Sequence, residues 1–263
     1  MRYLILPLLL VASSAQAADR ELCADRPGLG TPACTVEPGT FQLELGLADW
    51  TREDEGTERT DTLLAGDSLV RIGLDGRTEA RIEWTGYGDV RERDRALHRT
   101  IAREDGVGEL TLGLRRNLCN PDGRGFSLAV QPSVTLPVGG KAIGAGTWEA
   151  SLIMPVDVEI GRGMTLSLSP ELDAAADEHR NGHHLAYANI LGVALDLTNA
   201  VTATIEAEAM RDRDPAHHVT EVYAAFSVAW QPANDWQLDA GVVGGLNHNS
   251  ADVELALGLV RKF

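Results

Sequence analysis

Hydrophobic and polar residues alternate strictly along many short stretches of this chain. The last stretch, residues 252–263, is the clearest case. One face of its two-residue repeat carries Val253, Leu255, Leu257, Leu259 and Phe263, and the other carries Glu254, Ala256, Gly258, Val260 and Lys262. A period of two predicts a β-strand with one face in an apolar medium. A final aromatic residue is typical of the closing strand of an outer-membrane barrel, where the ring lies at the lipid–water boundary.

The same alternation recurs at regular intervals. It predicts strands over residues 40–50, 60–73, 78–87, 107–117, 126–136, 147–160, 164–175, 185–195, 201–210, 219–230, 236–245 and 252–263. The stretch 185–195 allows two registers: either Asn189 lies on the apolar face, or Leu191 and Val193 face the polar side, and a bulge could switch between them. An even number of strands, about twelve, predicts a closed up-and-down barrel with both ends on one side.

The connections between these strands are of two kinds. Those after odd-numbered strands are mostly longer and charged, and include 51–58 and 88–105, whereas those after even-numbered strands are mostly tight Gly, Asp or Asn turns. Aromatic residues also sort into a turn-end group (Phe41, Phe126, Trp230, Trp236, Phe263) and a loop-end group (Trp50, Trp84, Tyr87, Trp148, Tyr187). A soluble β-sandwich would explain the alternation but neither asymmetry. Short periplasmic turns, long external loops and two aromatic girdles instead predict an all-β fold, a closed up-and-down antiparallel transmembrane β-barrel.

The first residues read as a secretory signal peptide. Arg2 supplies the positive charge, residues 3–11 the apolar core, and Ala15-Gln16-Ala17 a cleavage site of small residues. A buried first helix is the alternative. No later stretch approaches the ~20 apolar residues of a membrane helix. The sequence therefore predicts a signal peptide (1–17), a periplasmic N-terminal segment (18–39) that could enter the barrel mouth as a small plug, and a barrel (40–263) in the outer membrane of a Gram-negative-type bacterium.

Composition adds two constraints. A net charge of −16 argues against nucleic-acid binding, which needs a basic surface. Cys23 and Cys34 bracket a short segment rich in Pro and Gly and are candidates for a disulfide in the oxidising periplasm. Whether they pair stays open at this point, and Cys119 would be left single in a turn.

Several stretches resemble a known family. They are 25–28, 36–44, 106–115, 131–137 and the terminal strand. In these the chain is similar to the bacterial outer-membrane β-barrel family of transporters that is named for the meta-pathway of phenol degradation. The resemblance implies a barrel and the passage of small solutes, with aromatic compounds as one candidate class. Arg261 departs from the alternation of the terminal strand, and its long side chain can reach the headgroup region.

If the apolar faces contact lipid, the lumen is charged. The candidates for lining it are Glu44, Arg71, Arg77, Arg81, Glu83, Arg115, Glu171, Asp173, Glu206 and Glu208. A basic stripe facing an acidic wall selects solutes by charge, which predicts a passive channel. The alternatives are a closed structural or ligand-sensing barrel, in which these charges pair and fill the lumen, and an outer-membrane lipid hydrolase. No Gly-x-Ser-x-Gly motif occurs, so no catalytic residues and no enzymatic activity are expected.

All seven histidines fall in predicted external loops or at their margins. His183, His184, His217 and His218 lie near Asp177, Glu178, Asp212 and Asp214, and imidazole with carboxylate suits zinc, copper or nickel. Polar loops also collect histidine without any metal, so the expectation is no cofactor, with a divalent metal at the external loops as the alternative. The expected partners are outer-membrane lipid, a small-molecule solute, and the barrel-assembly machinery through the C-terminal strand ending at Phe263, without nucleic acid.

Overall fold

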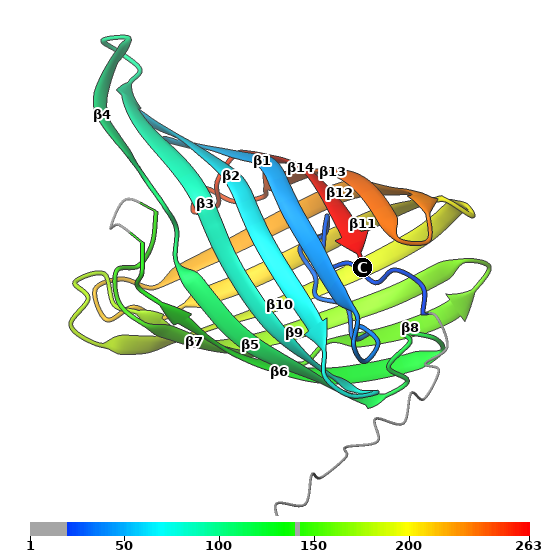
Figure 1. Cartoon of the computed structure of the whole chain (residues 1–263). Coiled ribbons are helices and arrows are strands. Elements are labelled where there is room, and N and C mark those ends of the chain that lie inside the picture. Colours follow the sequence, from blue (N-terminus) through cyan, green and yellow to red (C-terminus); the bar gives the residue numbers. More distant parts are fainter. Residues whose placement is uncertain (1–19, 140–142) are drawn as a thin grey trace, which may run out of the picture.

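A computed structural model describes residues 20–139 and 143–263 (Figure 1). The predicted signal peptide, 1–17, lies outside the described residues. The strands are β1 (Phe41–Glu55), β2 (Glu58–Gly73), β3 (Thr78–Asp94), β4 (Arg99–Gly106), β5 (Leu110–Cys119), β6 (Phe126–Leu136), β7 (Glu149–Ile153), β8 (Val156–Gly161), β9 (Met164–Ala176), β10 (His183–Thr198), β11 (Val201–Asp212), β12 (Val219–Ala233), β13 (Trp236–Gly245) and β14 (Val253–Lys262). Among the described residues, no helix is long and apolar enough to cross a membrane.

The sheet closes on itself. Each strand pairs antiparallel with its neighbours, β14 pairs with β1, and β9 pairs with β10, so the ring has no open edge. Of the fourteen strands in the described residues, β4 pairs only with β3 outside the ring, and β7 and β8 share one position between β6 and β9. This leaves twelve positions, as the sequence predicts. The break between β7 and β8 falls at Pro155, because proline has no N–H to donate to the ladder.

The wall is apolar outside and charged inside. Leu257, Leu172 and Ile205 are 54%, 53% and 65% exposed on the outer surface, whereas Arg71 and Arg115 are fully buried within the ring. A soluble protein places these residue types the other way round. An exposed apolar wall on a closed barrel is stable in the hydrocarbon core of a bilayer, where every backbone polar group must be paired within the protein.

Two strands differ in detail from their patterns. The register of β1 shifts between Gly46 and Ala48. This bulge ends the predicted alternation at Ala48 and turns Asp49 inward, where it is 9% exposed. In β10 the pairing runs without a shift from Ala186 to Asp196, and Asn189 lies on the exposed outer face with Leu191 and Val193. The first of the two predicted registers is therefore correct.

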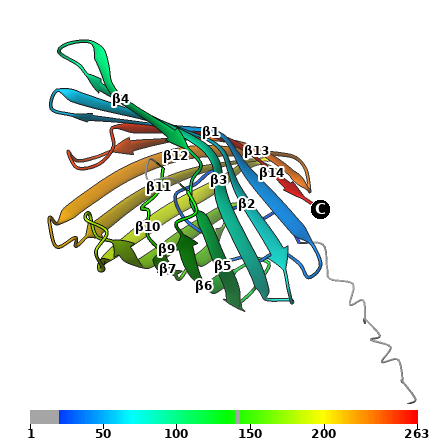
Figure 2. The same ribbon diagram turned by 60° about the vertical axis from the view of Figure 1, so that its left-hand side comes forward.

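Two predicted loops are in fact strands. Residues 51–58 extend β1 and β2 around a turn at Gly56 and Thr57, and most of 88–105 forms the β3–β4 hairpin, which projects beyond the ring (Figures 1 and 2). Opposite charges face each other across these strands: Asp54 pairs with Arg59 at 2.6 Å, and Arg52 with Asp61 at 3.0 Å. The prediction was wrong because charge density was interpreted as loop, whereas cross-strand ion pairs support an extended ladder in water.

Candidate functional site

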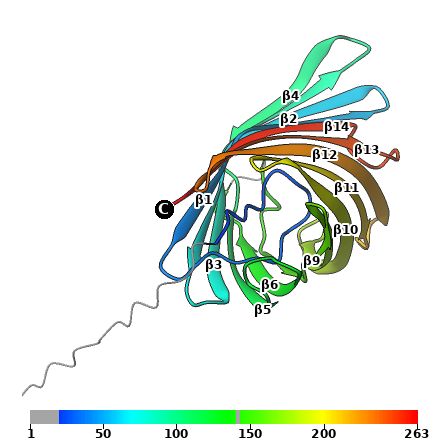
Figure 3. The same cartoon turned by 90° about the vertical axis from the view of Figure 1, so that its right-hand side faces the viewer.

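The N-terminal segment lies inside the barrel. Figure 3 shows this blue trace within the ring of strands, and we refer to residues 20–39 as the plug. It occupies the short-turn end of the barrel, where the rings of Phe41 and Phe263 stack with centroids 4.5 Å apart. Residues 20–39, the described part of the predicted N-terminal segment, thus lie in the mouth of the barrel and fill part of the lumen.

Acidic side chains of the wall hold the backbone of the plug. Leu29 and Gly30 each donate a backbone N–H to the Glu206 carboxylate at 2.8 Å. Further backbone N–H donors to wall carboxylates are Asp25 to Glu44 at 2.9 Å, Ala33 to Asp157 at 2.7 Å and Val36 to Glu79 at 2.8 Å. An extended segment without a strand partner leaves its N–H groups unpaired, and burial makes that costly. The carboxylates supply the missing acceptors, in bonds strengthened by their charge.

A glycine allows this close approach. A Cβ atom at Gly28 would lie 2.7 Å from Glu206 Oε2 and would push the carboxylate off the two N–H groups. Glycine at this position of the Pro/Gly-rich segment is therefore required by packing, because a side chain would displace the carboxylate.

Three buried arginines anchor Asp25 of the plug. Arg71 approaches its carboxylate at 3.0 Å and Arg115 at 2.7 Å, and Arg81 also pairs with it. Arg71 bonds Glu79 of the wall at 2.8 Å as well. Burial alone would raise the pKa of Asp25, but Arg115, Arg81 and Arg71 together lower that pKa below its ordinary value. The Asp25 carboxylate therefore stays ionised, and the predicted basic stripe serves as its binding site.

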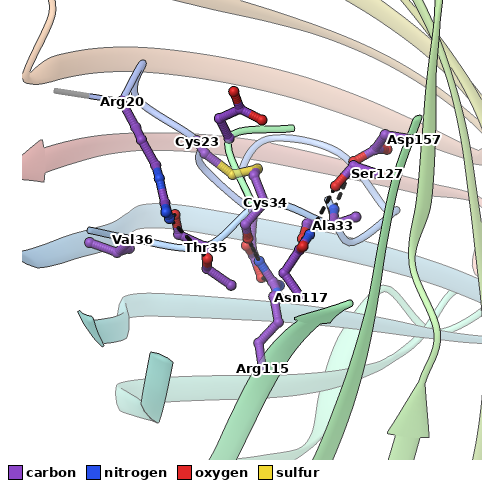
Figure 4. The surroundings of a disulfide bond; sticks show 12 residues. Arg20, Cys23, Ala33, Cys34, Thr35, Val36, Arg115, Asn117, Ser127 and Asp157 are labelled. Atoms are coloured by element: carbon purple, nitrogen blue, oxygen red, sulfur yellow. Dashed lines mark hydrogen bonds and ion pairs between the residues drawn. A yellow bond between two sulfur atoms is a disulfide. The ribbon is translucent and has the colours of Figure 1, made fainter. Parts of the chain in front are cut away.

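A disulfide closes the middle of the plug. Cys23 and Cys34, the two candidates whose pairing the sequence left open, are bonded, and Cys119 is free. Figure 4 shows Arg115 reaching Cys34, whose carbonyl oxygen accepts a hydrogen bond from the guanidinium at 3.2 Å. Next to it, Asn117 donates to the carbonyl oxygen of Ala33 at 2.8 Å (Figure 4). The disulfide and the two strand residues of β5 thus fix the same part of the chain.

Nine of the ten predicted lumen residues face the interior, in two groups. Glu44, Arg71, Arg81, Arg115 and Glu206 contact the plug, and Glu83, Glu171, Asp173 and Glu208 line water-accessible space. Arg77 was predicted wrongly. It is exposed in the turn between β2 and β3, where its guanidinium donates to the carbonyl oxygen of Leu118 at 3.1 Å, because the hairpin reverses there.

The sequence did not reveal Asp157, Ser169 and Asn117 as plug contacts. Ser169 Oγ both accepts from the N–H of Thr31 at 3.1 Å and donates to its carbonyl oxygen at 3.0 Å. Strand alternation places such residues inside, but it does not show which of them meets a segment 84 to 138 positions away.

An acidic cavity lies between the plug and the long-loop end. Its volume is about 370 Å³. Its charged lining consists of Arg81, Glu83, Glu149, Glu171, Asp173 and Asp212. A second cavity, of about 350 Å³, runs along the plug and shares Arg81 and Glu83 with the first. Because the arginines are held against Asp25, the open part of the lumen is dominated by carboxyl groups.

Of the four histidines predicted as metal ligands, two lie beside carboxylates and two do not. His184 and His217 lie against carboxylates, with His184 Nδ1 3.1 Å from Asp177 Oδ1 and His217 Nδ1 3.4 Å from Glu178 Oε2. His183 instead packs on Trp148, with ring centroids 4.0 Å apart. His218 is exposed. One histidine of each adjacent pair in the sequence, His184 and His217, therefore lies beside carboxylates.

Comparison with known proteins agrees with this architecture. Residues 24–263 match the family described as "Putative MetA-pathway of phenol degradation". The chain belongs to this family. A search of curated proteins found no match to the sequence.

Several solved structures share the fold. An outer membrane channel from Pseudomonas putida F1 is 15% identical, with a TM-score of 0.66 over 90% of this chain and 99% of that one. The NanC porin is 8% identical, with a TM-score of 0.53 over 85% of this chain and 100% of that one. The translocator domain of the autotransporter NalP from Neisseria meningitidis is 13% identical, with a TM-score of 0.52 over 87% and 90%. At these identities the likeness concerns the fold alone.

The family and the wall, which is apolar outside and charged inside, together indicate where the protein lies in the cell. The closed barrel with its apolar exterior lies in the outer membrane of a Gram-negative-type bacterium, in contact with lipid.

Proposed function

We propose that the protein is a passive, non-enzymatic channel for small solutes through a charged lumen, with the plug as its constriction. The observation that carries this proposal is the acidic cavity of about 370 Å³ between the plug and the long-loop end of a closed barrel. A lipid-facing structural barrel has no need for water-accessible, charged space in its interior.

The charge of this space sets its preference. Glu83, Glu171 and Asp173 face it, whereas Arg71 and Arg115 are bound to the plug. Carboxyl groups along a narrow path attract cations and repel anions. Small cations and neutral molecules are therefore the preferred solutes.

Reconstitution of the mature chain in planar bilayers tests this function. In a KCl gradient, the reversal potential should show preference for K⁺ over Cl⁻. Glu171→Gln combined with Asp173→Asn should weaken that preference, while Glu104→Gln on β4, outside the ring, should leave it unchanged. Absence of conductance at any salt concentration would exclude the channel.

Aromatic solutes are the finer part of the proposal, supported by the name of the family. A current-block measurement addresses it without interference from direct permeation of the bilayer. Phenol should reduce the K⁺ current at lower concentration than cyclohexanol of similar size. Equal block by the two compounds would leave a channel without aromatic preference.

A closed, ligand-sensing barrel is the second candidate, and the plug favours it. Its backbone bonds to Glu44, Glu79, Asp157 and Glu206 could hold the lumen shut. The two candidates differ in the bilayer experiment, because only the channel conducts ions in the absence of a ligand.

The C-terminal strand is the proposed contact for the barrel-assembly machinery. Phe263 follows β14 and is 59% exposed. An exposed aromatic ring at the end of the closing strand is the feature that supports this role. Phe263→Ala should lower the amount of assembled barrel in the membrane.

A further inference from the structure

Two loops meet around one buried histidine at the long-loop end of the barrel. They are residues 177–182, between β9 and β10, and 213–218, between β11 and β12. The His184 side chain is 6% exposed. Its Nδ1 lies 3.1 Å from Asp177 Oδ1 and 3.6 Å from Asp214 Oδ2, and its Nε2 lies 2.9 Å from Asp212 Oδ1.

The charges around this ring do not balance. Three carboxylates surround one imidazole, which can carry at most one positive charge. Among the described residues, no Lys or Arg forms an ion pair with Asp177, Asp212 or Asp214. The neighbouring arginines point elsewhere, Arg213 over the ring of Tyr187 at 6.0 Å and Arg180 toward Gly146. Backbone N–H groups of Glu178 and Ala216 donate to Asp214, and that of Asp214 donates to Asp212. These bonds do not remove the excess negative charge, and partly buried charge that is not offset is costly.

The hydrogen bonding of His184 is also incomplete. Within residues 20–139 and 143–263, no group forms an aligned hydrogen bond with the buried Nε2, although Asp212 Oδ1 is close by. A buried ring nitrogen without a bond in line is unusual, since most buried polar atoms have a partner. The ring is thus held in place by its surroundings while its polar atoms are not fully used.

We propose that His184 Nδ1, Asp177 and Asp214 bind a divalent transition-metal ion of the zinc class. Their ligand atoms all lie within 4.8 Å of one another. Zinc bonds of about 2.0–2.2 Å in a tetrahedron place ligand atoms roughly 3.3–3.6 Å apart, and the 3.1 and 3.6 Å separations here fall close to this range. One imidazole nitrogen with carboxylate oxygens suits zinc, whereas calcium and magnesium take oxygen ligands.

Asp212 would orient the ligating ring of His184 through its second nitrogen. When Nδ1 binds the metal, Nε2 carries the proton, and Asp212 Oδ1 is the acceptor within reach. Ligating histidines commonly donate their second N–H to a carboxylate, which fixes the ring. Asp212 also lines the acidic cavity, so the ion would fasten the two loops to each other beside the entrance to the lumen.

Metal titration of the folded protein tests the site independently of conductance. After treatment with EDTA, the detergent-solubilised mature chain should bind about one equivalent of Zn²⁺ with micromolar affinity or tighter, and Co²⁺ should give the visible absorption of a low-symmetry site. Calcium at millimolar concentration should not compete. Affinity for Zn²⁺ weaker than millimolar overturns the proposal.

Variants assign the ligands. His184→Ala and Asp177→Asn should each weaken Zn²⁺ binding at least ~10-fold, and Asp212→Asn by about 10-fold. Asp177→Asn, in a loop, gives a result even if His184→Ala fails to fold. His183→Ala and His218→Ala are the matched controls and should bind as the wild type does. The neighbouring trio of buried Asp214 with exposed Glu178 and His217 is the competing location, and binding that is lost in His217→Ala but kept in His184→Ala would overturn the assignment.

Discussion

At the residue scale, buried acids act as acceptors for backbone that has no strand partner. Glu206 is 5% exposed, and both of its oxygens accept from the plug, one from Leu29 and one from Gly30. Hydrogen bonds to a charged group contribute roughly 1.5–3 kcal/mol, more than neutral ones. The acidic composition of the inner wall is therefore partly a consequence of the plug.

We expect Glu206→Gln to loosen the plug locally, because the amide keeps one acceptor oxygen and places an NH₂ group against the other N–H. Hydrogen exchange at the amides of Leu29 and Gly30 should accelerate by at least about 10-fold, the effect of losing ~1.5 kcal/mol. Glu208→Gln is the matched control, since Glu208 lies two residues further on the same face and lines the cavity next to Leu29. Equal exchange in the two variants would mean that the Glu206 bonds do not hold the plug.

At the element scale, the plug is ordered without being helix or strand. Its fixation comes from wall side chains and from the Cys23–Cys34 disulfide, which spans a sequence separation of 11 residues. A cross-link closing a loop of ~15 residues stabilises the folded form by about 3 kcal/mol through the entropy of the open chain. The strand ladders of the ring do not include these residues. The plug and the barrel can therefore respond separately to reduction.

Reduction of the disulfide should increase channel opening while the barrel stays folded. The open probability in planar bilayers should rise after addition of a phosphine reductant, and the far-UV circular dichroism should not change. Cys119→Ser should respond in the same way, because Cys119 forms no disulfide. An unchanged open probability would show that the wall contacts alone fix the plug.

At the scale of the whole molecule, the two ends of the barrel face different compartments. The long-loop end carries the β3–β4 hairpin, with Leu97 61% exposed at its tip, and the other end carries short turns such as that at Asn199. The plug enters from the short-turn end, next to Phe263. The topology of outer-membrane barrels places long loops outside the cell and short turns in the periplasm.

Labelling of intact cells tests this orientation. A maleimide that cannot cross membranes should label Leu97→Cys but not Asn199→Cys, and both should react after the cells are lysed. The wild type controls for Cys119, which lies near the short-turn end and should not react in intact cells. Labelling of Asn199→Cys alone would invert the orientation.

Much of the fold follows from the period of two. Alternation gave the twelve ring positions, the outward face of β14 and most lumen residues, because each side chain on a strand belongs to one of two faces. It did not reveal the β1 bulge at Gly46–Ala48 or the β3–β4 hairpin. A bulge changes the face without a reliable local signal, and charged strands in water resemble loops in composition.

Local sequence pattern is enough to predict a barrel with lipid outside and charge inside, because alternating polarity admits one stable arrangement in a bilayer. The roles of the interior charges become visible only in the folded molecule. The fold sets Arg71, Arg81 and Arg115 against Asp25, makes Glu206 an acceptor for residues 176 and 177 positions earlier, and brings Asp214 to His184. These contacts join segments far apart in sequence, and their partners depend on ring closure and on the path of the plug, which local pattern does not encode.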